Sequence, residues 1–516
     1  MGGDARPQVG ASNGSAPPAD SVQLIDALVE TGAIGSTLRQ LSDRVALPTV
    51  RVSAALEALQ ADGQVLRMGR GLWILSDYER LNERPDFVDP EEFTERFVRE
   101  GGPGLGTYHG PITFSSNEEL PVHRWWPYVQ GYSAEFVAGL IRAAEVPRGG
   151  TVLDPFSGSG TTLVEGRRAG LRAVGFEILP PAALAARVKT EFGLRADDLR
   201  RTADRVIARG KRRRAGHPPF LRETHRQFHP KTLSSLTRLR DALPLGNTAV
   251  DRAARVAFGA SLIPVSRLRR SPCLGYGPDR PDRAPDPFAE FDRRVDVMRE
   301  DLAALSPTRA AWGPPAEIHE GDSRSIRLPP GSVDLAVTSP PYVNGMDYVM
   351  NYKLDLAWLG YARGYSDLAR LRQAMVSCDN LPRIEAARFL STKDLPDPWL
   401  SEILGRIRSN VERKGSYRRQ DVHGIVRRYF DDLLPVLRGV YAALAPRGRF
   451  SLVVGDSLLA GAYVPGDLIL ARMGVGVGFR IASVEKARSR RSGQRRSFEL
   501  RESIVTLEKP GRPRPR

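Results

Sequence analysis

The sequence predicts an α/β protein whose main domain is a doubly wound sheet with a helical insertion, preceded by a small N-terminal domain. Residues 148–180, "RGGTVLDPFSGSGTTLVEGRRAGLRAVGFEILP", contain a strand pattern, a glycine turn, a helix pattern and a second strand pattern. Two later apolar segments end in polar residues, in "IHEGDSRSI" and "SVDLAVTSPPY". Strands that alternate with helices in this way form mostly parallel sheets with helices on both faces.

The overall composition sets the broad class. The chain has 516 residues, enough for two or three domains. It has no apolar run long enough to cross a bilayer, and residues 1–20 have no apolar signal core, so we expect a disordered leader and no membrane partner. The two cysteines, Cys273 and Cys378, are too few for a disulfide framework or a zinc site. We therefore expect no metal and a cytoplasmic location.

The charge favours a polyanionic partner. The net charge is +16, with an isoelectric point near 10.1. An arginine-rich composition spread over the whole surface would give the same total. Positive charge is, however, concentrated in "GKRRRAGH", "RKGSYRR" and "RSRRSGQRR". The clusters favour nucleic acid as the partner.

Residues 21–78 predict three helices followed by a hairpin. Apolar residues recur at helical spacing three times, and "QVLRMGRGLWIL" then forms two short strands around a glycine turn. This order resembles a winged helix-turn-helix module with its recognition helix at about 48–61. Arg51 would be exposed on that helix, and Arg67 and Arg70 would lie on the wing. Modules of this kind bind DNA or protein, and both partners stay open here.

The rest of the chain divides by composition. Residues 79–118 are rich in Pro, Gly and acidic residues and predict a linker. The first part of the main domain spans 119–350, with the helical insertion at about 190–315. Residues 351–430 are mixed and polar, and 431–508 predict a long helix, a buried strand and a closing antiparallel pair. The basic tail 509–516 has no reason to fold.

The glycine turn carries the first functional motif. Gly158 and Gly160 follow a strand and open a helix, so the backbone can approach a ligand closely. Asp154 precedes the turn, and the next strand ends in Glu177, where a carboxylate can bind both hydroxyls of a ribose. A plain structural turn is the alternative. The acid, the glycines and the second acid together favour a cofactor that contains a nucleoside.

"DPFSGSGTT" and "GFEILP" resemble the first two motifs of the amino-group DNA methyltransferases. The resemblance implies a Rossmann-like methyltransferase fold and S-adenosylmethionine as cofactor. "GDSR" resembles the third motif, and its acid would reach the adenine. "VHRWWPYVQGYSAEFVAGLI" resembles the helix-bearing motif before the turn, in which we expect His123 and Tyr132 to pack. The implied cofactor residues are Asp154, Phe156, Gly158, Gly160, Thr161, Glu177 and Asp322.

"TSPPY" resembles the catalytic motif of the same family, and a simple proline turn is the alternative. The lone pair of an exocyclic amine on a nucleobase is delocalised into the ring, so the amine is a poor nucleophile. The Ser339 hydroxyl and the Pro340 carbonyl can accept hydrogen bonds from that amine and direct its lone pair at the methyl group. Pro340 and Pro341 hold these acceptors in place, and Tyr342 would stack on a base that has left the duplex.

Two other motifs are weaker. "SPCLG" contains the Pro-Cys pair of cytosine-C5 methyltransferases, but we expect Cys273 to be structural because no strand precedes it. "VVGDS" has one glycine after a strand, which is typical of an ordinary turn. The target-recognition region has no motif, and 351–430 is assigned to it by elimination.

These motifs predict a site-specific methyltransferase that acts on double-stranded DNA, alone or with restriction or phage-defence components. Enzymes of the family that methylate N4 of cytosine mostly carry Ser at the position of Ser339, whereas those that methylate N6 of adenine mostly carry Asp or Asn. The sequence therefore favours cytosine N4, although many such enzymes carry the catalytic motif before the glycine motif. An RNA base methyltransferase and an inactive DNA-binding regulator are the other hypotheses. The chain has no recognisable RNA-binding module, which argues against an RNA base methyltransferase. The intact motifs argue against an inactive regulator.

Overall fold

The computed structural model describes most of the chain. The described residues are 19–31, 36–62, 64–68, 71–75, 90–128, 131–191, 193–270, 273–277, 285–376, 395–414, 421–491 and 499–511. Most of the predicted leader, the end of the basic tail, Cys378 and the predicted wing residue Arg70 lie outside them. None of the described helices is both long enough and apolar enough to span a membrane.

The chain divides into two compact units. The first comprises the residues up to Phe87 together with Gly405–Val422 and Ala460–Ala462, and the second comprises the remainder. The elements of the first unit are α1 (Ala19–Thr31), β1 (Ser36–Thr37), α2 (Leu38–Val45), α3 (Thr49–Ala61), β2 (Val65–Met68) and β3 (Leu72–Leu75). Its three strands pair antiparallel in the order β1-β3-β2.

The helices of the first unit pack against one another through their apolar faces. Leu28, Leu41, Leu56 and Trp73 belong to one buried core that α1, α2, α3 and the sheet share. Thr37 caps α2, and its side chain accepts a hydrogen bond from the backbone of the third helical residue. The three predicted helices and the predicted hairpin are therefore present.

The second unit contains the predicted sheet. Its strands are β4 (Gly106–Thr107), β5 (Thr151–Asp154), β6 (Arg172–Glu177), β9 (Glu317–Glu320), β10 (Val333–Thr338), β11 (Leu444–Gly455), β14 (Arg480–Arg491) and β15 (Glu499–Glu508). They are ordered β4-β14-β15-β11-β10-β5-β6-β9. β9, β6, β5, β10 and β11 run parallel, and β15 is antiparallel to both of its neighbours. The α/β class with a mixed, mostly parallel sheet is confirmed.

The strand order places a crevice between β5 and β10. The chain runs outward from β5 through β6 to β9, then returns to β10 beside β5 and continues to β11. Ligands of doubly wound sheets bind at such a reversal, beyond the carboxyl ends of the strands. Asp154 ends β5 and Thr338 ends β10, so the glycine turn and "SPPY" both begin at this edge.

Helices cover the sheet. They are α6 (Ala134–Ala143), α7 (Thr161–Arg168), α8 (Pro180–Lys189), α19 (Val422–Ala443) and α20 (Gly466–Val477). α7 packs on β5 and β6, and α20 packs on β14 and β15. A Cβ at Gly166 of α7 would lie 2.4 Å from Val152 Cγ1, so only glycine allows this helix to approach β5 so closely.

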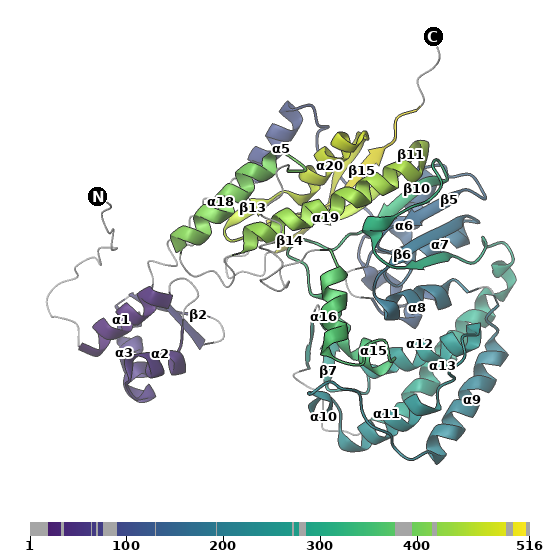
Figure 1. The fold of residues 1–516 in the computed structure, drawn as a ribbon, viewed down its shortest axis with the longest axis horizontal. Helices are drawn as coiled ribbons and strands as arrows, with labels where there is room; N and C mark the ends of the chain where they lie inside the picture. Colours follow the sequence, from purple (N-terminus) through teal and green to yellow (C-terminus); the bar gives the residue numbers. More distant parts are fainter. Residues whose placement is uncertain are drawn as a thin grey trace, which may run out of the picture. The chain divides into compact units, whose positions relative to one another are not determined.

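The predicted insertion is helical but also contains a hairpin. Its helices are α9 (Ala196–Arg212), α10 (Thr224–Gln227), α11 (Pro230–Ala242), α12 (Ala249–Leu262) and α13 (Pro287–Arg309), and its strands are β7 (Leu268–Arg270) and β8 (Leu274–Tyr276). Figure 1 shows this helical group beyond α8, away from α19 and α20. Cys273 is exposed between β7 and β8, so the expectation that no strand precedes it is wrong. That strand belongs to a separate hairpin, outside the central sheet.

The prediction of a linker over 79–118 is wrong from Pro90 onward. Residues Pro90–Arg99 form α5, whose Phe93 and Phe97 are buried one helical turn apart. Gly106–Thr107 form β4, which pairs with β14 at the edge of the central sheet. Glu91, Glu92 and Glu95 lie on the exposed face of α5, and their acidic character disguised its apolar face.

The remaining elements of the structure are η3 (Phe114–Asn117), η4 (His123–Trp125), η5 (Ser323–Ser325), α14 (Tyr348–Asn351), α15 (Lys353–Trp358), α16 (Tyr365–Ala374), α18 (Trp399–Lys414), β12 (Ser457–Leu459) and β13 (Ala462–Val464).

The segment predicted for target recognition has helices at both ends. The long helix α19 begins at Val422, inside the segment 351–430 that was assigned to target recognition. Nothing in the structure tests that assignment.

Candidate functional site

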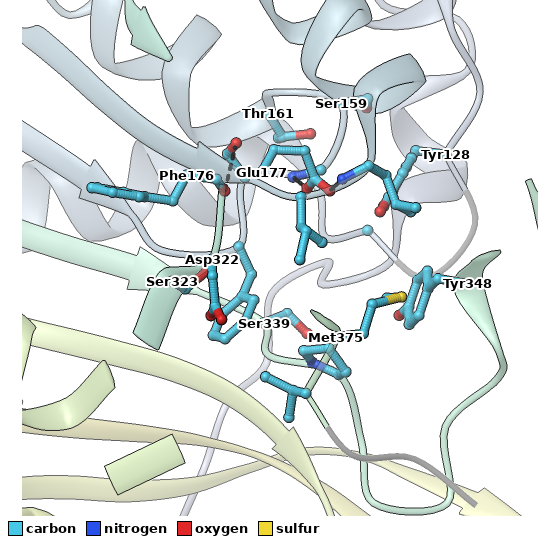
Figure 2. A pocket seen from close by; sticks show the side chains of 18 of the residues that line it. Tyr128, Ser159, Thr161, Phe176, Glu177, Asp322, Ser323, Ser339, Tyr348 and Met375 are labelled. Atoms are coloured by element: carbon cyan, nitrogen blue, oxygen red, sulfur yellow. Dashed lines mark hydrogen bonds between the residues drawn. The ribbon is translucent and has the colours of Figure 1, made fainter. Parts of the chain in front are cut away.

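The main cavity lies at the carboxyl ends of β5, β6 and β10. It has a volume of about 70 Å³. Its wall consists of Tyr128, Gly131, Tyr132, Phe156, Ser157, Gly158, Ser159, Thr161, Phe176, Glu177, Ile178, Leu179, Asp322, Ser323, Ser339, Pro341, Tyr348, Ala374, Met375 and Val376. Figure 2 shows Glu177 and Ser339 on opposite sides of this space.

Asp154 and Gly160 shape the glycine turn from behind the cavity wall. The Asp154 carboxylate is fully buried and accepts hydrogen bonds from the Tyr132 hydroxyl at 2.5 Å and the Thr338 hydroxyl at 2.8 Å. These contacts tie the end of β5 to the end of β10. Gly160 has φ +89°, and a Cβ there would lie 2.9 Å from the Ala186 Cβ. Both residues lie near the predicted site without lining the cavity, so they position its wall.

Glu177 is a buried carboxylate at the wall of the main cavity. Its side chain accepts hydrogen bonds from the Gly158 amide at 2.8 Å and the Leu179 amide at 2.7 Å. Burial, the largest cause, raises its pKa to about 7. A carboxylate has about four acceptor sites, and the backbone amides of Leu179, Gly158 and Ile178 act on this one, so acceptor capacity remains for a further donor. The hydroxyls of a ribose are donors of this kind.

Asp322 follows β9 and lines the main cavity, as the motif predicts. Arg324 binds its carboxylate, with Nε 2.9 Å from Oδ1 and Nη2 2.7 Å from Oδ2. The same guanidinium donates to Asp432 on α19. Asp322 is therefore held rigidly by an arginine while its side chain borders the cavity.

Ser339, Pro341 and Tyr342 follow β10 but border two different spaces. Ser339 and Pro341 line the main cavity, whereas Tyr342 does not. Tyr342 lines a second cavity of about 110 Å³, which we call the arginine cavity. Its wall consists of Ile112, Thr113, Gly131, Tyr132, Ser339, Tyr342, Val453, Arg488, Arg490 and Glu502. Ser339 lines both cavities.

Tyr342 is fixed at its hydroxyl and covered on its ring. The hydroxyl donates to Glu502 Oε1 at 2.6 Å, and the Arg490 guanidinium lies 4.9 Å from the ring centroid. Burial and then the Glu502 carboxylate raise the pKa of Tyr342 well above its ordinary value. The tyrosine therefore keeps its proton, and the expected stacking surface already has an arginine against it.

The sequence missed several residues of the main cavity. Tyr128 lies in the motif that precedes the glycine turn, and its ring stacks on Tyr352 at 5.5 Å. Phe176 comes immediately before Glu177, and its ring stacks on His319 at 4.6 Å. Tyr348 and Met375 come from a segment without any motif. Two signals in the sequence could have found some of these residues: Tyr128 lies within a quoted motif, and Phe176 is the apolar residue next to the strand-end acid Glu177.

His123 and Tyr132 were expected to pack, and His123 does. It is fully buried, and its Nε2 lies 2.8 Å from Glu165 Oε1. Burial lowers the pKa of His123. Tyr132 is also buried, but it lines both cavities and holds Asp154, so it is part of the site's scaffold.

Lys189, at the end of α8, braces the glycine turn. Its ammonium nitrogen donates to the Ser159 hydroxyl at 3.2 Å and to the Trp126 carbonyl at 3.1 Å. Ser159 lines the main cavity. Burial lowers the pKa of Lys189 to about 7. The charged form is therefore disfavoured in the folded protein.

Lys189→Met is expected to flatten the pH dependence of folding stability between about pH 7 and 10.5. The folded pKa is about 7 and the ordinary value is 10.5, so in this window the unfolded chain binds more protons at Lys189. Stability therefore rises with pH, by at most about 1.4 kcal/mol per pH unit. Urea unfolding at pH 7.0 to 9.5 measures the slope. Lys231→Met, an exposed lysine on α11, is the control and should keep it.

Comparison with known proteins gives a family match over the segment that contains the glycine motif. Residues 121–186 match the N6/N4 methyltransferase family, described as DNA methylase. Type II methyltransferase M.AvaI from Nostoc sp. is 25% identical over 404 residues, which cover 72% of this chain and 82% of that protein. Type II methyltransferase M.BsoBI from Geobacillus stearothermophilus is 24% identical over 485 residues, which cover 84% of this chain and 92% of that protein.

Among solved structures, TrmN from Thermus thermophilus matches with a TM-score of 0.26 and 11% identity. The match covers 76% of this chain and 53% of that chain. From the sequence matches, this chain is a distant homologue of type II methyltransferases and carries a segment of the N6/N4 DNA methylase family.

Proposed function

We propose that this protein transfers a methyl group from S-adenosylmethionine to an exocyclic amine of a base in double-stranded DNA, and that the amine is N4 of cytosine. One observation carries the proposal. Ser339 follows the central strand β10 and lines both the main cavity and the arginine cavity. A hydroxyl at that place can contact an amine in one cavity beside a methyl donor in the other. N6 of adenine is the alternative acceptor.

The main cavity fits the cofactor. Glu177 would accept hydrogen bonds from the two ribose hydroxyls, and Asp322 would reach the adenine amine. Gly158 and Phe156 on the glycine turn would lie against the remainder of the molecule, with Thr161 beside them at the start of α7. When bound, S-adenosylmethionine supplies a methyl group on a positively charged sulfur.

The protein itself would contribute by orienting the amine of the target base. The Ser339 hydroxyl and the Pro340 carbonyl would accept hydrogen bonds from the amine, which draws its nitrogen toward a tetrahedral geometry. These acceptors would direct the nitrogen lone pair toward the main cavity, where bound S-adenosylmethionine would supply the methyl group, and the displaced amine proton would pass to water. Pro340 and Pro341 keep the acceptors in place before the substrate arrives, so little reorganisation is needed.

The first unit would supply DNA affinity. We interpret its three helices and antiparallel strands as a winged helix-turn-helix module, with α3 as the recognition helix. Arg51 on α3 is exposed, as expected, and is paired with Asp20 at 2.7 Å. Arg67 on β2 is exposed as well, with its guanidinium 5.7 Å from the Trp73 ring centroid. A DNA phosphate would compete for both guanidiniums.

Expression in a host free of DNA methylation tests the proposal. Nucleoside mass spectrometry of the host DNA is expected to find N4-methylcytosine. N6-methyladenine without N4-methylcytosine would contradict the choice of base and leave the amino-methyltransferase reaction in place. Neither base in DNA, together with methylated RNA, would contradict the choice of substrate. A Ser339→Ala chain expressed in parallel controls for methylation by the host.

A further inference from the structure

The arginine cavity opens directly beside the main cavity. Gly131, Tyr132 and Ser339 line both spaces. A wider groove of about 870 Å³ shares Thr113, Gly131 and Arg488 with the arginine cavity. A base that has left the duplex therefore has a route through the groove to the face of Ser339 that the cofactor does not occupy.

The far wall of the arginine cavity is built on β14 and β15. Arg488 and Arg490 are two residues apart on β14, so both side chains project from the same face of the sheet. Glu502 on β15 lies directly opposite Arg488 in the strand pairing. The register of two paired strands thus places two guanidiniums and one carboxylate at the catalytic serine.

The Glu502 carboxylate of this wall already has a donor on each oxygen. Glu502 is buried, with 4% of its surface exposed. One of its carboxylate oxygens accepts from the Tyr342 hydroxyl, and the other accepts from Arg488 Nε. A base amine placed against Glu502 would share the carboxylate with these two donors. Ser339 lines the same cavity and offers a hydroxyl acceptor.

A donor of this wall remains available. Arg490 donates through Nη2 to the Asp456 carbonyl at 2.8 Å, and its guanidinium lies against the Tyr342 ring. Its Nε is buried and closed to a ligand. Arg490 and Arg488 nevertheless both line the arginine cavity, and the Arg488 side chain is 45% exposed, so the guanidinium groups of both can donate to a ligand there.

Cytosine and adenine differ in what they present next to the reacting amine. In cytosine, the ring nitrogen N3 and the carbonyl oxygen O2 follow N4 along the edge of the ring, and both accept hydrogen bonds. In adenine, N1 follows N6 and accepts, but the next position is a C–H group. Guanidinium groups match adjacent acceptors well, and a C–H group would leave a buried donor unpaired.

We infer that the arginine cavity holds the target base and that Arg490, supported by Arg488, recognises the N3 and O2 edge of cytosine. The inference rests on the proposed function and adds the residues that select the base. Tyr342, clamped between Glu502 and Arg490, then acts as a positioning residue that sets the arginine against the base.

Arg490→Met is expected to slow cytosine methylation by about 10- to 150-fold, the range for a lost hydrogen bond to a charged group. DNA from a methylation-free host is incubated with pure enzyme and S-adenosylmethionine, and N4-methylcytosine and N6-methyladenine are quantified. The ratio of methyladenine to methylcytosine should rise. The affinity for S-adenosylmethionine, measured by calorimetry, should stay within about twofold. Arg480→Met, exposed at the other end of β14, is the matched control and should behave as the wild type.

A second measurement changes the base as well as the arginine. DNA copied with 2-thiocytosine presents sulfur, a weak acceptor, in place of O2. Wild-type enzyme should methylate it more slowly than ordinary DNA, and Arg490→Met should show a smaller difference between the two DNAs.

Three results would overturn the inference. They are a wild-type rate in Arg490→Met, an equal 2-thiocytosine effect in both enzymes, and a wild-type enzyme that methylates adenine alone. A wild-type enzyme that methylates neither base would overturn the proposed function as well.

Discussion

Ser339→Ala is expected to lower turnover by about 10²–10³-fold, because the substitution removes an acceptor aimed at the reacting amine. The side chain borders both cavities, whereas the backbone of the Pro-Pro motif stays in place. The loss should therefore appear in the methyl-transfer step and not in cofactor binding. Single-turnover methylation of host DNA measures the rate, and calorimetry measures the affinity for S-adenosylmethionine.

The control for this variant is Ser234→Ala, on α11 of the helical insertion. Ser234 is exposed and has no proposed role, so removal of its hydroxyl should change neither rate nor cofactor affinity. If Ser339→Ala keeps the wild-type single-turnover rate, the hydroxyl does not contact the amine. Equal losses of rate and cofactor affinity would instead show that Ser339 shapes the main cavity.

Glu177→Ala is expected to weaken S-adenosylmethionine binding by about 1.5–3 kcal/mol, the usual contribution of a hydrogen bond to a charged group. The affinity of the wild type should also depend on pH. The pKa of Glu177 is raised to about 7 in the free protein, and donors from a ribose favour the ionised carboxylate. Binding should therefore release a proton, and affinity should rise as the pH rises through about 7.

Calorimetric titrations from pH 6.0 to 8.5 measure this dependence, and Glu177→Gln, which cannot titrate, should lose it. Glu320→Gln is the matched control. Glu320 ends the neighbouring strand β9, but its side chain is 45% exposed and pairs with Arg187 at 2.8 Å. Wild-type affinity in Glu177→Ala would contradict the proposed ribose contact. A flat pH profile in the wild type would contradict the link between cofactor binding and proton release from Glu177. The affinity of Glu177→Ala would then be the test of the ribose contact.

Strand ends and their acids could be predicted from local sequence. β6 ends at Glu177 and β10 ends at Thr338, as the apolar runs and the polar residues after them indicated. Both positions follow from a short-range pattern, since a buried parallel strand is an apolar run bounded by turn residues. The amphipathic pattern of α5 is equally local, but its acidic composition led to the wrong prediction of a linker.

The sequence could not predict which residues of each motif line a cavity and which do not. The glycine motif contains Asp154, Gly158 and Gly160, yet only Gly158 lines the main cavity. Likewise, Ser339 and Tyr342 are three residues apart but Tyr342 lines only the second cavity. Small changes in backbone direction at a strand end decide which side chains project into a cavity, and sequence spacing does not record that direction.

By itself, the sequence determined the α/β class, the order of the motifs and their meeting at one edge of a sheet. Parallel strands place their carboxyl ends together whatever the connections between them. Only the tertiary structure decided what stands opposite Ser339. Arg488 and Arg490 belong to the basic cluster "RSRRSGQRR", which pointed to nucleic acid but to no site, and Glu502 carries no motif. All three lie about 150 residues beyond Ser339, and the antiparallel register of β14 and β15 brings them there. Such long-range strand pairing depends on the packing of the whole sheet, so no local pattern contains it.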